Sequence, residues 1–308
     1  KDMLVAGATL PATLGASVPK SNSADMKTIG WELSLGWNDR LENGFSYWVK
    51  GVLSDYQATI TKYAGNDAGF YSQSDGDGKY YVGQKIGEIW GYHSNGLFQS
   101  DDEAATIDQS ELYAGKWGAG DVKYEDLDGD GKITKGEETI YNPGDKSIIG
   151  NKTPRYQFGI TVGFDYKNFD FEMFWQGTGK RDYMLSGAQF WGFTSQWDVP
   201  YTPALDYWTE TNTDAYFPRP GWQNGGNRVT SDRYLQSAAY GRLKNLTVGY
   251  TIPKNLTTKW GISRLRLYVT GENLLTITPL NDAFDPETLG GLTYPINRKV
   301  AIGLNLTL

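Results

Sequence analysis

The residues with the clearest chemistry lie in an acidic segment, 126–137, which reads DLDGDGKITKGE. Its spacing fits the calcium-loop pattern D-x-[DN]-x-[DN]-G-x5-E at every position. Calcium takes six to eight hard oxygen ligands. In this pattern the ligands are carboxylates at every second residue, a backbone carbonyl and a final bidentate glutamate, and a glycine permits the sharp turn between them. The predicted ligands are Asp126, Asp128, Asp130, Lys132 through its carbonyl, Thr134 and Glu137.

The flanks of this acidic segment do not predict the helix pair of an EF-hand. Gly118-Ala119-Gly120 precedes it, and Asn142-Pro143-Gly144 breaks the chain after it. We therefore expect an isolated loop in which a structural Ca²⁺ stiffens a connection between strands. The alternative is a solvated acidic turn that binds no metal.

The chain offers little material for catalysis. It has one histidine, His93, and no cysteine. The lack of cysteine excludes disulfides, thiolate metal sites and cysteine nucleophiles. Because a Ser-His-Asp relay needs a histidine, the single histidine makes such a relay hard to build. His93 is interpreted as a loop residue with no catalytic role, and no pair of carboxylates stands out at hydrolase spacing. We therefore expect no enzymatic activity.

Aromatic residues concentrate between residues 178 and 237, interspersed with short amides and carboxylates. Aromatic faces stack on sugar rings, and amides and carboxylates bond to hydroxyls, so glycan contact is one interpretation. The alternative is that these side chains pack the segment onto itself or onto a partner, since a long loop needs its own core. The substrate-binding candidates are Trp191, Trp197, Trp208 and Trp222.

Composition and charge restrict the class of protein. Twenty-nine basic and 36 acidic residues give a net charge of −7, the wrong sign for a protein that binds phosphate backbones, so we expect no nucleic-acid partner. No segment approaches the roughly 20 apolar residues of a membrane-spanning helix. Membrane-spanning strands need only about 9 to 11 residues of alternating polarity, so a barrel is compatible with this sequence.

Period-two alternation recurs along the chain and predicts strands that have one apolar face. In the segment 156–166 every even position is apolar or aromatic, and the odd positions carry Gln, Gly, Thr and Asp. Short polar links between several such segments predict antiparallel hairpins. A helical period is limited to a short stretch, 101–113. The alternating segments are 31–37, 45–53, 156–166, 169–175, 240–252, 265–269 and 300–308.

Strand length and loop asymmetry favour a transmembrane barrel over a soluble, secreted β-sandwich. Strands of roughly 10 to 13 residues exceed the usual soluble strand, and aromatic residues cluster at their ends, as in the girdles of outer-membrane barrels. Short links alternate with two long insertions, 57–153 and 178–237, as in barrels that have short turns on one side and long extracellular loops on the other. The alternative is a calcium-stabilised, carbohydrate-binding β-sandwich, whose strands also alternate. Arg242, Lys244, Arg264 and Arg266 are interpreted as lumen-facing or interfacial charges.

Several blocks of sequence carry a family resemblance that runs through nearly the whole chain. They resemble, in order, the SusC/RagA family of TonB-linked outer-membrane transporters. The blocks are LPATLG at 10–15, GWELSL at 30–35, WGY at 90–92 with GLFQS at 96–100, GDVKY at 120–124 before the acidic segment, IGNKTPRY at 149–156, GENLLT at 271–276 and FDPE at 284–287.

The resemblance implies a barrel of about 22 antiparallel strands, to which residues 1–308 would contribute the C-terminal part, about eight to ten strands. It implies uptake of oligosaccharides or peptides across the cell outer membrane, driven by the TonB complex. It also implies a SusD-type surface lipoprotein as a lid and a dimer of such pairs. The family's N-terminal plug and TonB-contact segment have no counterpart in these 308 residues, so we expect them, with the rest of the barrel, to be supplied by the missing part.

Overall fold

The computed structural model describes residues 1–6, 15, 20–71, 80–221, 223–289, 294 and 296–308. The chain divides into two compact units. Unit 1 comprises Lys1–Ile29, Gln57–Thr153 and Asp182–Gln236. Unit 2 comprises Gly30–Tyr56, Pro154–Arg181 and Ser237–Leu308.

Strands dominate the secondary structure, and the helices are single turns. No helix in the described ranges has the length and apolar character to cross a membrane. The strands are β1 (Met3–Ala6), β2 (Lys20–Arg40), β3 (Ser46–Tyr63), β4 (Glu88–Tyr92), β5 (Ser94–Leu97), β6 (Val122–Tyr124), β7 (Lys146–Asn151), β8 (Arg155–Tyr166), β9 (Phe169–Lys180), β10 (Asp182–Met184), β11 (Leu235–Ser237), β12 (Tyr240–Thr251), β13 (Arg264–Ile277) and β14 (Lys299–Thr307). The helices are α1 (Asp101–Ala104), α2 (Ala188–Trp191) and α3 (Lys254–Thr257), with 3₁₀ turns η2 (Thr202–Leu205), η3 (Gly225–Arg228) and η4 (Thr258–Trp260).

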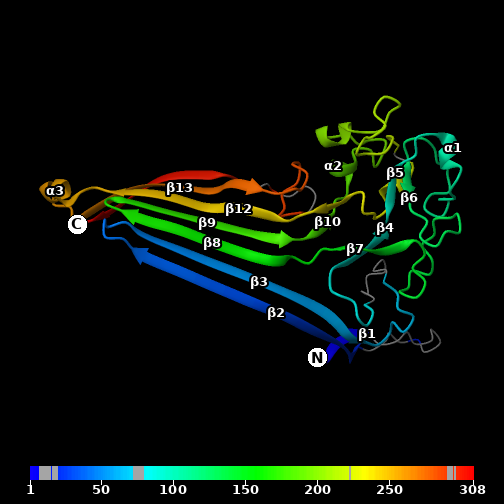
Figure 1. Cartoon of the computed structure of the whole chain (residues 1–308), viewed down its shortest axis with the longest axis horizontal. Helices are drawn as coiled ribbons and strands as arrows, with labels where there is room; N and C mark the ends of the chain where they lie inside the picture. The colour runs from blue at the N-terminus through cyan, green and yellow to red at the C-terminus, as the bar shows by residue number, and fades with distance from the viewer. Residues whose placement is uncertain (7–14, 16–19, 72–79, 222, 290–293, 295) are drawn as a thin grey trace. The chain divides into compact units, whose positions relative to one another are not determined.

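The long strands form one sheet in the order β1-β2-β3-β8-β9-β12-β13-β14 (Figure 1). Short turns join β2 to β3 and β8 to β9, as the polar links predicted. Lys167 and Asn168 connect β8 to β9, whose last and first residues, Tyr166 and Phe169, are paired. The pairs are antiparallel wherever their register is defined. The all-β, antiparallel fold predicted from the period is thus confirmed, and β2 and β3 run beyond the segments that alternate.

The register of unit 2 aligns the apolar residues of successive strands on one face. A single cross-strand row contains Tyr47, Phe164, Phe171, Val248, Val269 and Ile302. Val248 is 44% exposed, Val269 47% and Ile302 83%. An apolar face this open in the described residues does not fit a β-sandwich, in which such faces pack against a second sheet.

The other face of the unit 2 sheet is polar and carries ion pairs. Thr247 on β12 and Thr270 on β13 share a hydrogen bond of 2.9 Å. Four residues before Thr270 on the same face of β13, the guanidinium of Arg266 binds the carboxylate of Asp170 on β9. Unit 2 therefore has one apolar and one polar surface, as a wall between lipid and water requires.

Aromatic side chains gather at the hairpin end of unit 2. Phe45 stacks on Phe164 with ring centroids 5.4 Å apart, and Phe164 stacks on Phe171 at 5.0 Å. The rings of Phe169 and Tyr250 lie 4.7 Å apart. These rings lie beside the short turns, the position at which an outer-membrane barrel carries an aromatic girdle.

Unit 1 has its own core, built around small sheets. β4 pairs with β7, β5 with β6, and β10 with β11. Phe98, Tyr124, Phe190 and Tyr234 are fully buried within it. Most of the two long insertions is therefore folded, since unit 1 includes residues 57–153 and 182–236.

The helix expected over 101–113 forms only at its beginning. Ser100 caps α1 by accepting a hydrogen bond from the Glu103 amide, and the helix ends at Ala104. Further along, the amide of Asp108 donates to the Gly131 carbonyl, and the amide of Ile133 donates to the Asp108 carbonyl. These extended-chain bonds to the acidic segment replace the hydrogen bonds that a longer helix would need.

Candidate functional site

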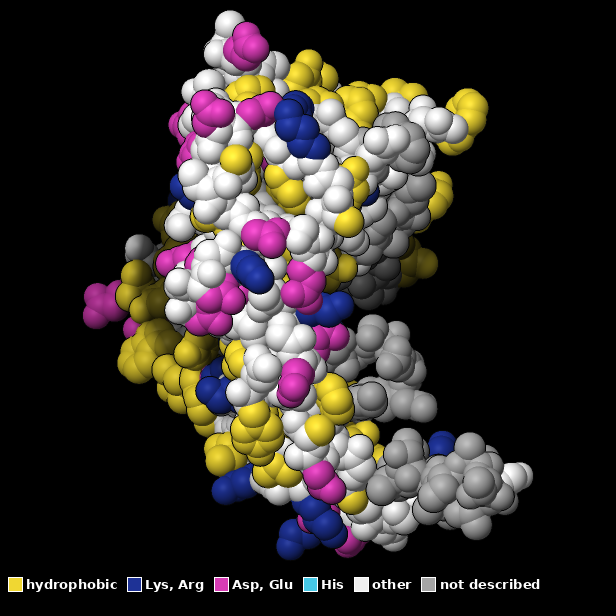
Figure 2. Space-filling model, turned by 90° about the vertical axis from the view of Figure 1, so that its right-hand side faces the viewer, with side chains coloured by type: hydrophobic (Ala, Val, Ile, Leu, Met, Phe, Trp, Pro, Cys, Tyr) yellow, Lys and Arg dark blue, Asp and Glu magenta, His cyan; other side chains and the backbone are white. Residues whose placement is uncertain are grey.

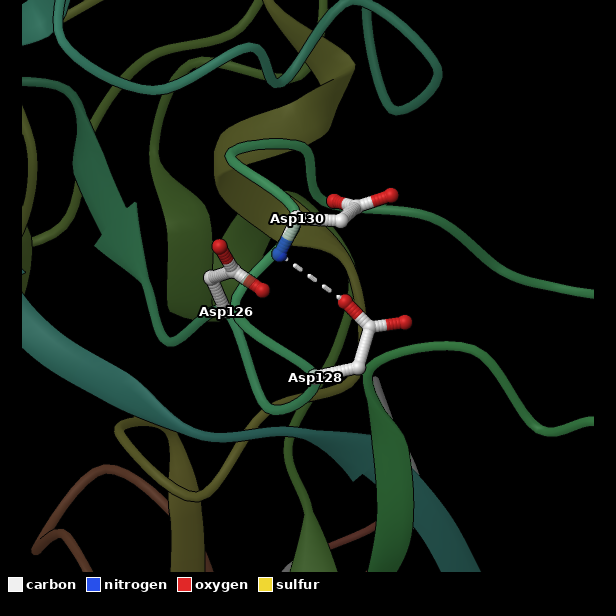
Figure 3. Close-up of side chains that lie close together, drawn as sticks. All are labelled: Asp126, Asp128 and Asp130. Atoms are coloured by element: carbon white, nitrogen blue, oxygen red, sulfur yellow. Dashed lines mark hydrogen bonds between the residues drawn. The ribbon is translucent and has the colours of Figure 1, made fainter.

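The three aspartates of the acidic segment lie together on one turn of unit 1 (Figure 3). One carboxylate oxygen from each lies within 4.8 Å of the others. The two oxygens of Asp126 accept from the amides of Gly129 and Gly131, both at 2.7 Å, and Asp128 accepts from the Asp130 amide at 3.2 Å. Three converging carboxylates are hard oxygen donors of the kind that calcium prefers.

The electrostatics of this turn differ between two of its aspartates. The amide hydrogen bond from Gly131 is the main reason that the pKa of Asp126 is lowered. At Asp128 the Asp130 amide acts in the same direction, but desolvation and the carboxylates of Asp130, Asp145 and Asp126 outweigh it and raise the pKa. The charge on Asp128 is therefore opposed by its neighbours, which a bound cation would relieve.

Glu137, the predicted closing ligand, is not brought to the three aspartates. Its carboxylate is outside the group whose oxygens lie within 4.8 Å, and its side chain is exposed. The turn that follows accounts for this position, because the Glu137 amide donates to the Asn142 carbonyl at 3.0 Å. Calcium coordination by Glu137 would need this side chain to move inward.

Asp145, which the sequence pattern did not select, closes the segment instead. It is 1% exposed, and its two oxygens accept from the amides of Leu127 and Thr134 at 2.8 and 2.7 Å. Its own amide donates to the Thr134 carbonyl at 3.1 Å. Asp145 thus fixes both ends of the turn, and the one sequence signal for it was its place directly after the breaker Asn142-Pro143-Gly144.

The remaining predicted ligands lie at the edge of this turn. The Lys132 amide donates to Asp130 at 2.8 Å, which keeps the Lys132 backbone beside the aspartates. Thr134 is partly exposed and is held by Asp145 through both its amide and its carbonyl. Both roles stay predictions.

The four candidate tryptophans have different surroundings. Trp191 and Trp208 are each 8% exposed, whereas Trp197 is 83% exposed. Trp222 lies outside the described residues. Among the described three, Trp197 alone presents an open indole face, and the packing alternative describes the other two.

Trp191 belongs to a cluster of rings in the core of unit 1. Its centroid lies 4.5 Å from that of Tyr234 in an edge-to-face arrangement, and Phe190 lies 5.1 Å from Phe217. The cavity beside Trp191 and Phe217 has a volume of only about 20 Å³. That is enough for a water molecule but not for a sugar ring.

His93 makes an arrangement that the sequence could not reveal. Its Nδ1 lies 2.7 Å from Asp232 Oδ2, and its Nε2 lies 2.7 Å from Ser147 Oγ. The other oxygen of Asp232 accepts from the Ser94 amide at 2.9 Å. The order Ser–His–Asp is that of hydrolase triads, but here it cross-links β7, the β4–β5 corner and the segment around Asp232, and we interpret it as structural.

The surface shown in Figure 2 carries charges of both signs. Asp and Glu side chains lie beside scattered Lys and Arg side chains, with uncharged surface between them. Among the ion pairs of unit 1, Lys123 binds Glu103 at 2.9 Å and Lys116 binds Asp101 at 2.7 Å.

Comparison with known proteins finds relatives that match nearly the whole chain. No protein-family profile matches it. It is 29% identical over 327 residues to TonB-dependent receptor P3 of Formosa agariphila, covering 96% of the chain, and 26% identical to receptor P26 of the same organism, covering 99%. It is also 24% identical to TonB-dependent receptor SusC of Bacteroides thetaiotaomicron over 92% of the chain. A structure of the RagAB peptide transporter matches 99% of the chain with a TM-score of 0.72 at 19% identity. The chain is SusC/RagA-like.

The SusC/RagA-like chain spans between 27% and 31% of the length of these three receptors. It covers 32% of the matching RagAB chain, and 31% of a chain in the structure of the RagAB peptide importer in its open-open state, where the TM-score is 0.71. At such identities the structural match shows the fold. The described sheet is therefore a fragment of an all-β barrel and corresponds to a C-terminal region of SusC/RagA-like receptors.

Proposed function

We propose that the chain is part of the barrel wall and outer loops of a TonB-dependent transporter, which takes up oligosaccharides or peptides across the cell outer membrane. The observation that carries this proposal is the two-faced sheet of unit 2. Its apolar row, from Tyr47 to Ile302, is open, and its opposite face holds the Arg266–Asp170 ion pair. A barrel wall needs lipid on the first face and water on the second.

The partners follow from the edges of the sheet. In the described residues β14 pairs with β13 alone, and β1 pairs with only the first part of β2. Unpaired edges in a membrane must be closed, because backbone polar groups find no water there. We assign these edges to the remainder of the barrel, and the polar face to the plug domain and the transported molecule.

The other partners are proposed by similarity. A SusD-type surface lipoprotein would cover unit 1, and the TonB complex would act through the N-terminal part of the whole transporter. Pairs of the two proteins would form a dimer. The similarity to receptors of the SusC and RagAB type supports these assignments.

We propose a structural role for calcium in the turn formed by Asp126, Asp128 and Asp130. The converging carboxylates and the raised pKa of Asp128 support a bound cation. Calcium there would stiffen the connection between β6 and β7. Substrate contact by Trp197 is proposed on its exposure.

The test uses the complete transporter in its own outer membrane. Uptake of labelled oligosaccharide and peptide mixtures is measured in cells with and without the gene, and with and without a protonophore that removes the energy for TonB. We expect uptake of one mixture to need both the gene and the energised membrane. Uptake that persists without the gene, or that ignores the protonophore, contradicts the proposed function.

A further inference from the structure

A hollow in unit 1 has the walls of a ligand site. Its volume is about 410 Å³, within the usual range for sites that hold small molecules. We call it the Trp90 pocket. The lining residues used below are Tyr71, Gln84, Glu88, Trp90, Lys152 and Tyr183.

One wall of the Trp90 pocket is aromatic. The rings of Tyr71 and Trp90 are stacked, with centroids 4.1 Å apart and an angle of 9° between their planes. Tyr81 meets Trp90 edge to face at 6.4 Å, which fixes the indole from a second direction. Tyr71 is buried behind Trp90, whose partly exposed indole is a rigid apolar surface of the kind on which the C–H face of a sugar ring packs.

The lining of the pocket also includes hydrogen-bonding groups. Gln84 is 3% exposed, and its Oε1 accepts from the Tyr81 amide at 3.2 Å. The indole Nε1 of Trp90 is buried and has no hydrogen-bond partner among the described residues. A buried N–H donor without a partner is uncommon unless water or a ligand completes it.

The carboxylate of Glu88 is held in place beside these groups. Its Oε1 accepts from the Lys85 amide at 3.1 Å, and its Oε2 accepts from the Tyr81 hydroxyl. Each oxygen retains a lone pair for a further donor. Lys152, whose side chain is exposed, adds a cation to the lining of the pocket.

The segment that presents Gln84 and Glu88 is rigid. The carbonyl of Ile86 accepts from Thr153 Oγ1 at 2.7 Å and from Asn151 Nδ2 at 3.1 Å. The Lys152 amide donates to the Gly87 carbonyl at 2.8 Å. Gly87 has a φ of 90°, and a Cβ there would lie 2.3 Å from Thr153 Oγ1, so the close approach needs glycine. A site held this way loses little entropy when it binds.

The pocket suits a carbohydrate better than an extended peptide. An extended peptide that adds a strand to a sheet gains its affinity from main-chain hydrogen bonds at a free edge. β4, which carries Trp90, pairs with β7 on one side, and Tyr92 bridges Ser231 on the other. An indole beside an amide, a carboxylate and a phenol instead matches the face and the hydroxyls of a sugar.

We propose that the Trp90 pocket binds one or two sugar units of an oligosaccharide cargo. The inference rests on the proposed function, because it takes the cargo of the transporter to be the ligand. Gln84 and Tyr183 donate to sugar hydroxyls, Glu88 accepts from them, and the indole of Trp90 packs against the ring.

The test measures binding by titration calorimetry on the complete transporter in detergent. The probes are neutral hexasaccharides of glucose, xylose and mannose, with a tryptic peptide mixture as competitor. Tyr183→Phe removes one hydroxyl, and Gln84→Met removes the amide. Tyr141→Phe is the matched control, since Tyr141 is 77% exposed and lies outside the pocket.

We expect at least one hexasaccharide to bind. Tyr183→Phe and Gln84→Met should each weaken it about three- to tenfold, while Tyr141→Phe leaves it unchanged. The thermal unfolding temperature of Gln84→Met shows whether a loss of binding comes from a folding defect. If Gln84→Met is unstable, Tyr183→Phe alone still tests the proposal. Equal affinity in all variants, displacement of the sugar by peptides, or no hexasaccharide binding overturns the pocket proposal. Energised uptake in whole cells reports separately on the proposed function.

Discussion

Arg242 on β12 and Asp285 in the β13–β14 connection form an ion pair, with Nη2 of the arginine 2.5 Å from Oδ2 of the aspartate. Arg242 is 2% exposed, and its Nη1 lies 3.2 Å from Glu287, which also binds Lys244 at 2.8 Å. Two cations on the strand thus hold two anions of the connection. From the sequence, Arg242 and Lys244 are interpreted as lumen-facing or interfacial charges. That interpretation does not predict that each binds a carboxylate 43 residues further along the chain.

Removing the Arg242 guanidinium should destabilise the barrel. Arg242→Met leaves Asp285 and Glu287 without their buried counter-charge, which costs about 3–5 kcal/mol. The measurement is the unfolding temperature of the complete transporter in detergent. Adding Asp285→Asn to Arg242→Met should recover part of the loss, and Arg40→Met, at an exposed arginine, should change little. An Arg242→Met variant as stable as the parent would show that the connection is not held by this pair.

The calcium proposal predicts which residues set metal content. Asp128→Ala should lower the affinity of the complete transporter for Ca²⁺ on the order of tenfold or more, because it removes a carboxylate ligand. Glu137→Ala should also lower it, because the spacing pattern predicts that the Glu137 side chain moves inward when the ion binds. Metal content after equilibrium dialysis checks this, with Asp102→Ala on α1 as an exposed acidic control. Unchanged content in both variants would refute the site. A loss with Asp128→Ala alone would leave Glu137 outside the coordination, where the structure has it.

The affinity for calcium should also decrease as the pH falls. The pKa of Asp128 is raised by its acidic neighbours, so Asp128 takes up a proton at a higher pH than an ordinary aspartate. Because the ion needs the ionised carboxylate, affinity should be full at neutral pH and fall as the pH drops through that raised pKa. Asp126, whose pKa is lowered, stays charged to lower pH. Calorimetric titrations of the parent and of Asp128→Asn measure this, and an equal pH dependence in the two proteins would exclude Asp128 as its cause.

His93 should contribute to structure and not to hydrolysis. His93→Phe removes the hydrogen bonds to Asp232 and Ser147, and we expect it to lower the free energy of opening of the segment 230–232 by about 1–3 kcal/mol. Hydrogen exchange at the Asp232 amide, which donates to the Tyr92 carbonyl, reports on this. Hydrolysis of a p-nitrophenyl ester should be equally low in the parent and in Ser147→Ala. Ester hydrolysis that disappears in Ser147→Ala would show a working triad instead.

The strands of the sheet could be predicted because the alternation of apolar and polar residues is visible within each short segment of sequence. Alternation in 156–166 and 300–308 identified strands whose pairing the structure confirms. The site was less predictable because its contacts join distant segments. His93 meets Asp232 139 residues away, and Asp145 reaches back to Leu127. The spacing rule assumed that Glu137 folds inward, but hydrogen bonds in the following turn hold its backbone to Asn142.

The most direct test of the barrel-wall assignment is the environment of single spin labels along β14. The chain has no cysteine of its own, so cysteines can be placed one at a time at residues 300–306 of the complete transporter, with any others replaced by serine. In lipid vesicles, labels at Val300, Ile302 and Leu304 should collide mainly with dissolved oxygen, and labels at Ala301 and Asn305 mainly with a water-soluble nickel chelate. Equal nickel accessibility at both sets of positions would contradict a lipid-facing wall.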